Sequence, residues 1–224
     1  MLKTIVKTGA IVSLVALTAT AFAGGPDHMA LASTTAQPSN QTGFFLGATA
    51  GMGTFNTDET FTAGGTTASI RNGVNSFLGG LLGGYQTVFS NNLYLAIVGN
   101  AMYNSLNANL ITLSTTNISS IKNNFQGGAA VHFGKRMGTA TPYLSAGVEA
   151  GSWKYSIPGF STTKTLVGPL AGVGVMFDVC HHWNAGLEYD YTWYSNINLG
   201  SGATTGKLKN AQGQAMAYAT YLFN

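Results

Sequence analysis

Eight segments of this chain alternate between apolar residues and small or polar residues, and this pattern limits what the chain can fold into. A period of two is typical of β-strands, because successive side chains point to opposite faces of a sheet. In the segment that begins at Trp183, for example, Leu187 lies on one face and Glu188 on the other. No stretch sustains a helical period. We therefore predict an all-β fold with strands at 43–55, 74–89, 93–104, 124–134, 142–155, 167–179, 183–193 and 212–223.

The facing of one segment stays open at this level. In 74–89, Phe77 and Leu81 share one parity, whereas Leu78 and Leu82 share the other. Both faces of this strand are therefore apolar enough to be the buried one.

The scarcity of charge indicates what surrounds the sheet. Only 8% of the residues are Asp, Glu, Lys or Arg, against about 25% in an ordinary soluble domain. Intrinsic disorder requires more charge and fewer apolar residues, and ten Lys and Arg spread over the chain form no nucleic-acid-binding patch. The 30 glycines of 224 residues follow no collagen period. A surface without charge is expected to face a partner or lipid.

The N-terminus has the pattern of a secretory signal peptide. Lys3 and Lys7 precede an apolar stretch, and the Ala21-Phe22-Ala23 sequence fits a cleavage site after residue 23. The alternative, an N-terminal transmembrane anchor, is disfavoured by the short apolar core. We expect residues 24–42 to be a flexible periplasmic leader. The single cysteine of an exported chain, without disulfide partners in the same chain, suits a Gram-negative envelope.

The connections between the predicted strands alternate in length. Long loops rich in Thr, Ser and Asn alternating with short turns are typical of outer-membrane barrels. The alternative is a secreted all-β sandwich or a soluble lipocalin-like barrel, but a soluble sandwich would carry charges on the outer faces of most strands. The expected long loops are 56–73, 105–123, 156–166 and 195–211, and the expected short turns are 90–92, 135–141 and 180–182.

Four motifs resemble one known family. They are GGYQ at 83–86, PYLSAGVEAG at 142–151, GLEYDYTWY at 186–194 and AYATYLF at 217–223. Together they are similar to the OmpA-type eight-stranded outer-membrane barrels. The resemblance covers residues 43–224 and implies an eight-stranded antiparallel up-and-down transmembrane barrel in the bacterial outer membrane.

The same resemblance implies several partners. These are outer-membrane lipid, lipopolysaccharide and the barrel-assembly machinery, which would recognise the terminal strand through Phe223, one residue before the end. We expect the barrel alone, without the peptidoglycan-binding domain of some relatives.

Aromatic residues gather near both ends of the predicted strands, as the two membrane interfaces require. Trp183, Tyr221 and Phe223 belong to the band beside the short turns, and Tyr191 and Trp193 to the band beside the long loops. Further aromatic residues that we assign to these bands are Phe89, Phe177, Phe55, Phe77, Tyr103 and Phe125.

The inward parity carries the few groups with chemistry. Glu149, Glu188 and Asp190 are the candidates inside the barrel, with His132 and Asp178 nearer the short turns. We expect a mildly acidic interior without obvious internal partners, because the nearest bases lie at or beyond the outer strand ends. Those bases are Arg71, Lys122, Lys154 and Lys164.

Three functions follow for such a barrel. We expect a structural anchor whose surface loops contact a host or surface ligand. A narrow channel for ions or small solutes through the acidic bore is the alternative, and a lipid-modifying enzyme is the third. We expect no catalytic set, because His132 is on the wrong half of its strand. We expect no cofactor and no metal site, because Cys180-His181-His182 lacks the spacing of zinc ligands.

Overall fold

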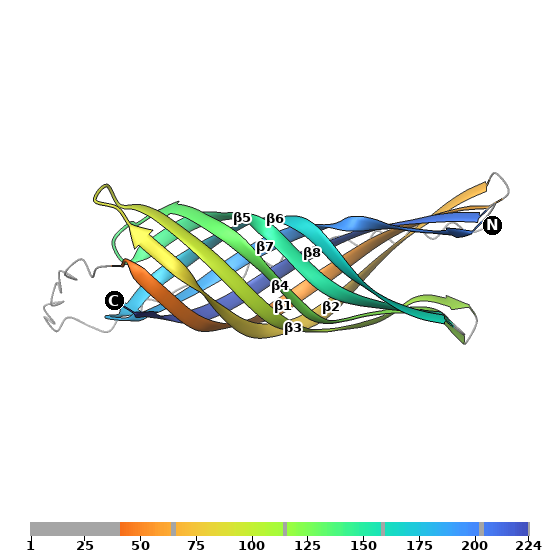
Figure 1. Cartoon of the computed structure of the whole chain (residues 1–224), viewed down its shortest axis with the longest axis horizontal. Coiled ribbons are helices and arrows are strands. Elements are labelled where there is room, and N and C mark those ends of the chain that lie inside the picture. The colour runs from red at the N-terminus through yellow and green to blue at the C-terminus, as the bar shows by residue number, and fades with distance from the viewer. Residues whose placement is uncertain (1–40, 64–65, 114–115, 158–159, 202–203, 224) are drawn as a thin grey trace, which may run out of the picture. The chain divides into compact units, whose positions relative to one another are not determined.

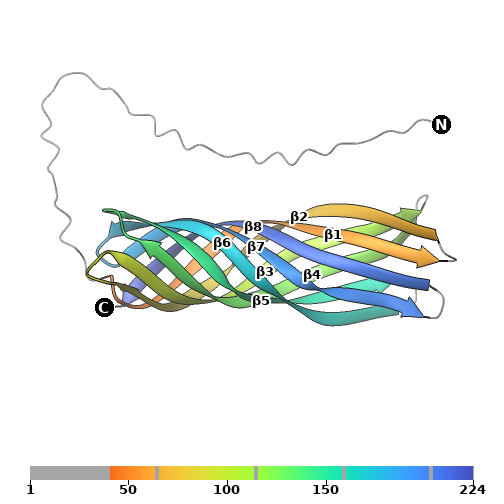
Figure 2. The ribbon, with the colours of Figure 1, turned by 90° about the horizontal axis from the view of Figure 1, so that it is seen from above.

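The computed structural model describes residues 41–63, 66–113, 116–157, 160–201 and 204–223. These residues form one closed barrel (Figure 1), and Figure 2 shows the same tilted strands after a quarter turn. The strands are β1 Gly43–Ala63, β2 Thr66–Val88, β3 Leu93–Leu113, β4 Thr116–Lys135, β5 Ala140–Ile157, β6 Phe160–Cys180, β7 Trp183–Ser201 and β8 Thr204–Phe223.

Within the described ranges, no helix is long and apolar enough to cross a membrane.

The barrel closes through the first and last strands. Each strand is antiparallel to its neighbours in chain order, and β1 pairs with β8 from Phe44↔Phe223 to Ala63↔Thr204. A closed sheet has no edge with unpaired backbone groups, which a lipid environment requires. The prediction of an eight-stranded antiparallel barrel is confirmed.

The strands are longer than the alternation predicted, and the expected long loops are mostly strand. β1 continues to Ala63 and β2 begins at Thr66, so that these two residues pair directly. The strands contain 18 to 23 residues, whereas about ten suffice to cross a bilayer. Threonine is β-branched and favours extended backbone, and cross-strand pairing stabilises the polar segments. The barrel therefore projects four β-hairpins at one end.

At the hairpin end the barrel separates into two four-stranded sheets. The pairing of β2 with β3 ends at Leu78↔Asn104, and that of β6 with β7 ends at Leu170↔Thr192. The other pairs continue toward their hairpins. We call β7, β8, β1 and β2 the first flap and β3 to β6 the second flap. Figure 1 shows the two flaps diverging at the end opposite the short turns.

Burial decides the facing of β2, which the sequence left open. Phe77, Leu81 and Tyr85 are exposed on the outside, whereas Leu78 is fully buried and Leu82 packs against buried residues inside. The outer surface of the barrel is a continuous apolar band. Further members of this band are Phe44, Leu46, Met52, Ile97, Val131, Leu144, Val148, Val167, Val173 and Leu187.

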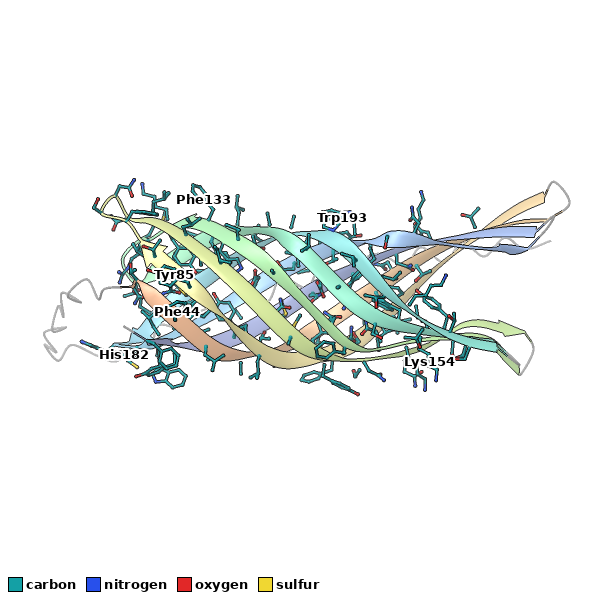
Figure 3. The ribbon with its side chains drawn as sticks, viewed as in Figure 1. Phe44, Tyr85, Phe133, Lys154, His182 and Trp193 are labelled. Atoms are coloured by element: carbon teal, nitrogen blue, oxygen red, sulfur yellow. The ribbon has the colours of Figure 1, made fainter. Side chains whose placement is uncertain are left out.

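The exposed aromatic residues lie near both ends of this band. Trp183 and Phe223 both pack edge-to-face against Tyr221 at the short-turn end. Tyr191 packs against Trp193 nearer the hairpins, with ring centroids 4.8 Å apart. Figure 3 shows Phe44, Tyr85 and Phe133 near the short turns and Trp193 further toward the hairpins.

Phe55 does not belong to the outer aromatic band to which the sequence assigned it. Its side chain is 1% exposed and stacks on Trp153 inside the barrel. The odd-numbered parity of β1, which includes Phe45 and Thr49, faces inward, so that Phe55 is an interior residue.

The predicted signal peptide at 1–23 and residues 24–40 of the leader lie outside the described residues. The last two leader residues contact the barrel. Gln86 Nε2 donates a hydrogen bond to Gln41 Oε1 at 3.1 Å, and the Thr42 and Thr87 hydroxyls lie 3.1 Å apart. These contacts hold residues 41 and 42 against β2.

The outward facing of β2 can be tested with Leu81, which lies midway between the exposed aromatic residues Phe77 and Tyr85. Arginine at the bilayer midplane costs about 2–4 kcal/mol in a membrane barrel. We expect Leu81→Arg to lower the free energy of unfolding by that amount in urea titrations of the barrel refolded in lipid vesicles. Leu81→Ala is the matched control, and an Arg variant as stable as this control would contradict the facing.

Candidate functional site in the barrel interior

The structure brings four of the five interior candidates close together and leaves the fifth at one end. Along β7, Glu188 and Asp190 follow each other on the inward parity, and His132 of β4 and Glu149 of β5 also point inward. Glu149, Asp190 and His132 are at most 6% exposed. Asp178 lies at the short-turn end of β6.

Glu149 is held by donors from two other strands. The Thr192 hydroxyl donates to Oε2 at 2.8 Å and the Tyr194 hydroxyl to Oε1 at 3.1 Å. Gln214 Nε2 lies 2.9 Å from both carboxylate oxygens. A buried carboxylate is tolerated when hydrogen bonds replace its water, so Glu149 ties β5 to β7 and β8 inside the barrel.

A second cluster lies closer to the short turns. Ser145 Oγ donates to Asp190 Oδ1 at 2.8 Å, and His132 Nε2 lies 3.4 Å from Glu188 Oε1. Glu188 also interacts with Asp190. The cluster therefore joins side chains of β4, β5 and β7, and its acids have internal partners that the sequence did not reveal.

Aromatic hydroxyls continue this cluster toward the short turns. The Tyr143 ring stacks on His132 with centroids 4.5 Å apart, and its hydroxyl lies 3.0 Å from that of Tyr218. Tyr143, Tyr218 and Tyr94 belong to the same packed group. The polar cluster is therefore in direct contact with the apolar side chains packed nearer the short turns.

Inward glycines provide the room for these side chains. A Cβ on Gly172 would lie 1.9 Å from Asp190 Oδ1 and 2.5 Å from Ser145 Oγ. A Cβ on Gly186 would lie 2.4 Å from the Tyr218 ring. Tyr218 of the neighbouring strand β8 therefore fills the space beside Gly186.

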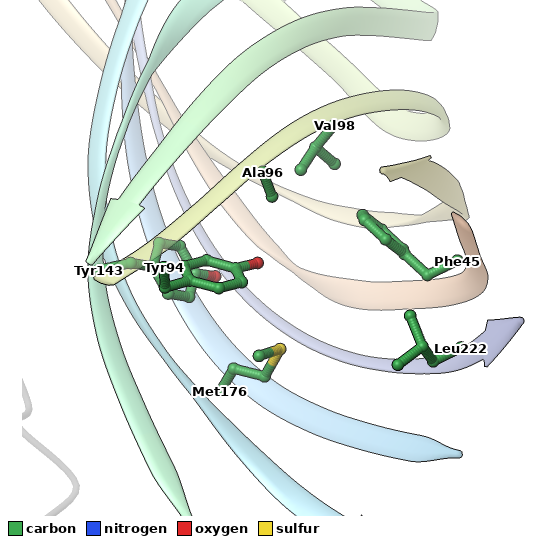
Figure 4. Packing of buried hydrophobic residues seen from close by; sticks show 7 residues of the cluster. All are labelled: Phe45, Tyr94, Ala96, Val98, Tyr143, Met176 and Leu222. Carbon is green, nitrogen blue, oxygen red and sulfur yellow. The ribbon is translucent and has the colours of Figure 1, made fainter. Parts of the chain in front are cut away.

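Two apolar clusters close the interior on either side of the polar groups. The hairpin-side cluster contains Phe55, Leu106, Ile121, Trp153, Leu166 and Tyr194, and joins strands of both flaps. The turn-side cluster, shown in Figure 4, contains Phe45, Tyr94, Ala96, Val98, Tyr143, Met176 and Leu222. When the half-buried neighbours of each cluster are included, side chains from seven strands form the hairpin-side cluster and side chains from six strands form the turn-side cluster.

A small cavity remains beside the turn-side cluster. Its volume is about 40 Å³, and Glu188, Asp190, His132 and Met176 are among its lining residues. A cavity of this size holds a few water molecules. The interior is thus a packed core with a small, mostly apolar cavity that two acids also line.

Asp178 has a partner that sequence reasoning missed. Arg136, in the short turn between β4 and β5, forms an ion pair with Asp178 through its guanidinium group. The backbone N–H of Asp178 also donates to the Thr139 carbonyl of the same turn. The expectation that the acids lack internal basic partners is therefore wrong for Asp178. Two charges separated by 42 residues gave no local signal in the sequence.

The Cys180-His181-His182 turn shows packing rather than a ligand arrangement. Cys180 is exposed, and His182 stacks on Tyr221 with centroids 5.4 Å apart. Within the described part of the chain, no group of three His, Cys, Asp or Glu residues could hold a common metal ion.

A closed antiparallel barrel with an apolar outer band, aromatic residues at its ends and a packed interior defines a membrane-spanning β-barrel. The sequence matches the outer membrane protein beta-barrel domain family over residues 12–217. The chain therefore belongs to this family, whose members lie in the bacterial outer membrane. No curated protein matches the sequence.

Several solved structures are similar to this chain. OprG from Pseudomonas aeruginosa has 14% identity and a TM-score of 0.50, with 81% of this chain and 97% of that chain covered. The Neisserial surface protein A has 17% identity and a TM-score of 0.47, with 80% of this chain and 97% of that chain covered. Ail, the attachment invasion locus protein of Yersinia pestis, has 12% identity and a TM-score of 0.38, covering 77% and 98%.

The Glu149 contacts generate a stability prediction. Glu149→Leu removes the acceptor of Thr192, Tyr194 and Gln214 and leaves their donors buried, at a cost of about 3 kcal/mol. We expect this loss in urea unfolding of the refolded barrel, with a smaller loss for Glu149→Gln, which keeps one acceptor oxygen. Val148→Ala, on the outward face next to it, is the control. Wild-type stability of Glu149→Leu would show that these hydrogen bonds contribute nothing.

Proposed function

We propose that the barrel is an outer-membrane anchor whose four hairpins project from the cell surface to bind a host or neighbouring molecule. The observation that carries this proposal is the contrast between the two parts of the molecule. The membrane-level interior is closed by two apolar clusters and leaves a cavity of about 40 Å³. The strands, in contrast, continue far beyond the length that spanning requires.

The hairpins offer a binding surface made of paired strands. Strand pairing continues to Ala63↔Thr66 in the first flap and to Leu113↔Thr116 in the second. Paired hairpins are stiffer than free loops, so a partner that binds them loses less conformational entropy on association. The gap in pairing between the flaps leaves two separate sheets to contact that partner.

Further partners belong to the same proposal. A signal peptide cleaved after Ala23 would export the chain, and the terminal strand with Phe223 would be recognised by the barrel-assembly machinery. Lipopolysaccharide would contact the apolar band on the side of the hairpins, because outer-membrane barrels place their longer connections outside the cell.

An enzymatic role is not part of this proposal. A serine nucleophile requires a base within hydrogen-bond reach. Ser145 donates to Asp190 instead, and His132 stacks on Tyr143. Both side chains are buried inside the barrel, away from the lipid and from the hairpins.

Trimming one hairpin tests the anchor function. Asp58 and Arg71 are direct cross-strand partners, so Asn-Gly in place of residues 59–70 would join them through a two-residue turn. We expect the trimmed barrel to keep its heat-dependent migration on gels, because the clusters inside are untouched. Attachment of expressing bacteria to cultured epithelial cells or to one another should fall to the level of cells without the protein.

A matched trim in the second flap, joining Tyr155 to Thr162 in the same way, shows which flap carries attachment. Wild-type protein that folds and is exposed on the cell surface without promoting either kind of attachment would contradict the anchor function.

A narrow channel remains the second candidate, because Glu188 and Asp190 line the cavity. The packed clusters predict that purified barrel in planar bilayers produces no discrete conductance steps. A channel would instead conduct, with a conductance that changes in Glu188→Gln or Asp190→Asn. Steps that respond to either substitution would replace the anchor proposal with the channel.

A further inference from the structure

Two lysines face each other across the outside of the second flap. Lys122 of β4 and Lys154 of β5 are direct cross-strand partners, and both side chains are exposed. Lys122 lies on the same outward face of β4 as Phe125, which is nearer the short turns. Lys154 likewise lies on the same outward face of β5 as Val148. Figure 3 shows Lys154 on the outer surface, further toward the hairpins than Trp193. Like charges placed directly opposite each other destabilise a sheet.

One acid at the hairpin end lies in register with bases on both neighbouring strands. In the first flap, Asp58 of β1 pairs with Arg71 of β2 on one side and with Lys209 of β8 on the other. The register thus alternates sign across three strands. The Lys122–Lys154 pair departs from this arrangement, and its repulsion calls for an anion from outside the chain.

The second flap has no acid that could serve as that anion. Its four strands contain only two carboxylates, Glu149 and Asp178. Glu149 is buried inside the barrel with its own donors, and Asp178 lies at the opposite end in an ion pair with Arg136. The outward neighbours of the lysines in the same register row are neutral hydrogen-bonding side chains, Asn107 on β3 and Thr163 on β6.

The height of the pair identifies the anion. Lys122 is three residues from Phe125, in a stretch with a β-bulge between Asn123 and Phe125, and so lies within roughly 10 Å of it along the strand. Tilt reduces this height, and the polar layer of a bilayer is about 5–8 Å deep on each side. Lysine side chains also extend toward the polar layer. The two ammonium groups therefore lie where the phosphates of the surrounding lipid lie.

We propose that Lys122 and Lys154 form a binding site for the phosphate of a phosphorylated glycolipid in the outer leaflet. The phosphate oxygens accept charge-assisted hydrogen bonds from both ammonium groups, while Asn107 and Thr163 contact the sugar. The acyl chains lie along the apolar band beside Phe125 and Tyr103. This site depends on one part of the proposed function, namely that the hairpins lie outside the cell.

The test uses full-length mature protein refolded in phosphatidylcholine vesicles with increasing amounts of diphosphoryl lipid A. Bound glycolipid is counted by native mass spectrometry, and thermal unfolding is followed by gel migration. We expect lipid A to raise the unfolding temperature of the wild type. Apparent affinity should fall about fivefold for Lys122→Gln or Lys154→Gln, and further for the double variant. The double arginine variant should keep its affinity.

Two variants separate this site from general charge effects. Lys135→Gln removes an exposed lysine of the same strand β4 at the short-turn end and should bind lipid A like the wild type. Lys122→Glu places opposite charges in register, so it should be more stable than the wild type in pure phosphatidylcholine and yet lose its response to lipid A. Loss of response in Lys135→Gln, or a full response in the double Gln variant, would overturn the site.

Two further arms identify the source of the phosphate. The same acylated disaccharide without phosphates should bind weakly and equally to all variants, and inorganic phosphate should not shift the unfolding temperature. An equal shift with inorganic phosphate would overturn the lipid assignment. All these variants keep their hairpins, so attachment in the trimming experiment should be unchanged. A failure of this site is therefore distinguishable from a failure of the anchor function.

Discussion

Backbone hydrogen bonding in lipid is the constraint on which the rest of this structure depends. A strand inside a bilayer has no water to satisfy its N–H and C=O groups, so the sheet has to close. Here β1 meets β8 along nearly its whole length, with Phe44 opposite Phe223. Closure with eight strands fixes a narrow interior. The interior must then be filled by side chains from strands that are far apart in sequence.

The narrow interior explains the distribution of small and polar residues. Where a large side chain enters, its neighbour has to be small, as Gly172 is beside Asp190 and Gly186 beside Tyr218. Polar groups are admitted at the level where donors and acceptors match, as around Glu149. On the hairpin side and on the turn side of that level, apolar clusters fill the interior. High glycine content and buried carboxylates are thus two consequences of one geometric limit.

The sequence predicted the fold well because facing and closure depend on a local, repeated signal. Alternation assigned Leu187 to the outside and Glu188 to the inside from adjacent residues alone, as the structure has them. It left the facing open where both parities were apolar, as at Leu78 and Leu81 of β2. It was wrong at the hairpins, where Thr- and Ser-rich segments look like loops until their pairing partners are known.

The interior contacts were beyond sequence reasoning for the same physical reason. Which acid meets which donor depends on the register of strands and on shear, and neither is encoded in a local pattern. Thr192 reaches Glu149 from 43 residues away, and Arg136 reaches Asp178 from 42. Residue type and parity did identify the inward acids, because a carboxylate on the opposite parity would face lipid. Their partners required the three-dimensional register.

Several charges of this protein lie where other groups compensate them. The interior acids are compensated by hydroxyl and amide donors and Asp178 by Arg136, and Asp58 lies in register with Arg71 and Lys209. Lys122 and Lys154, in contrast, lie in direct register with each other, and the strands of the second flap place no acid beside them. The face on which they lie points to the lipid, and the compensating charge has to come from there. The membrane then acts as a binding partner of defined chemistry as well as a solvent.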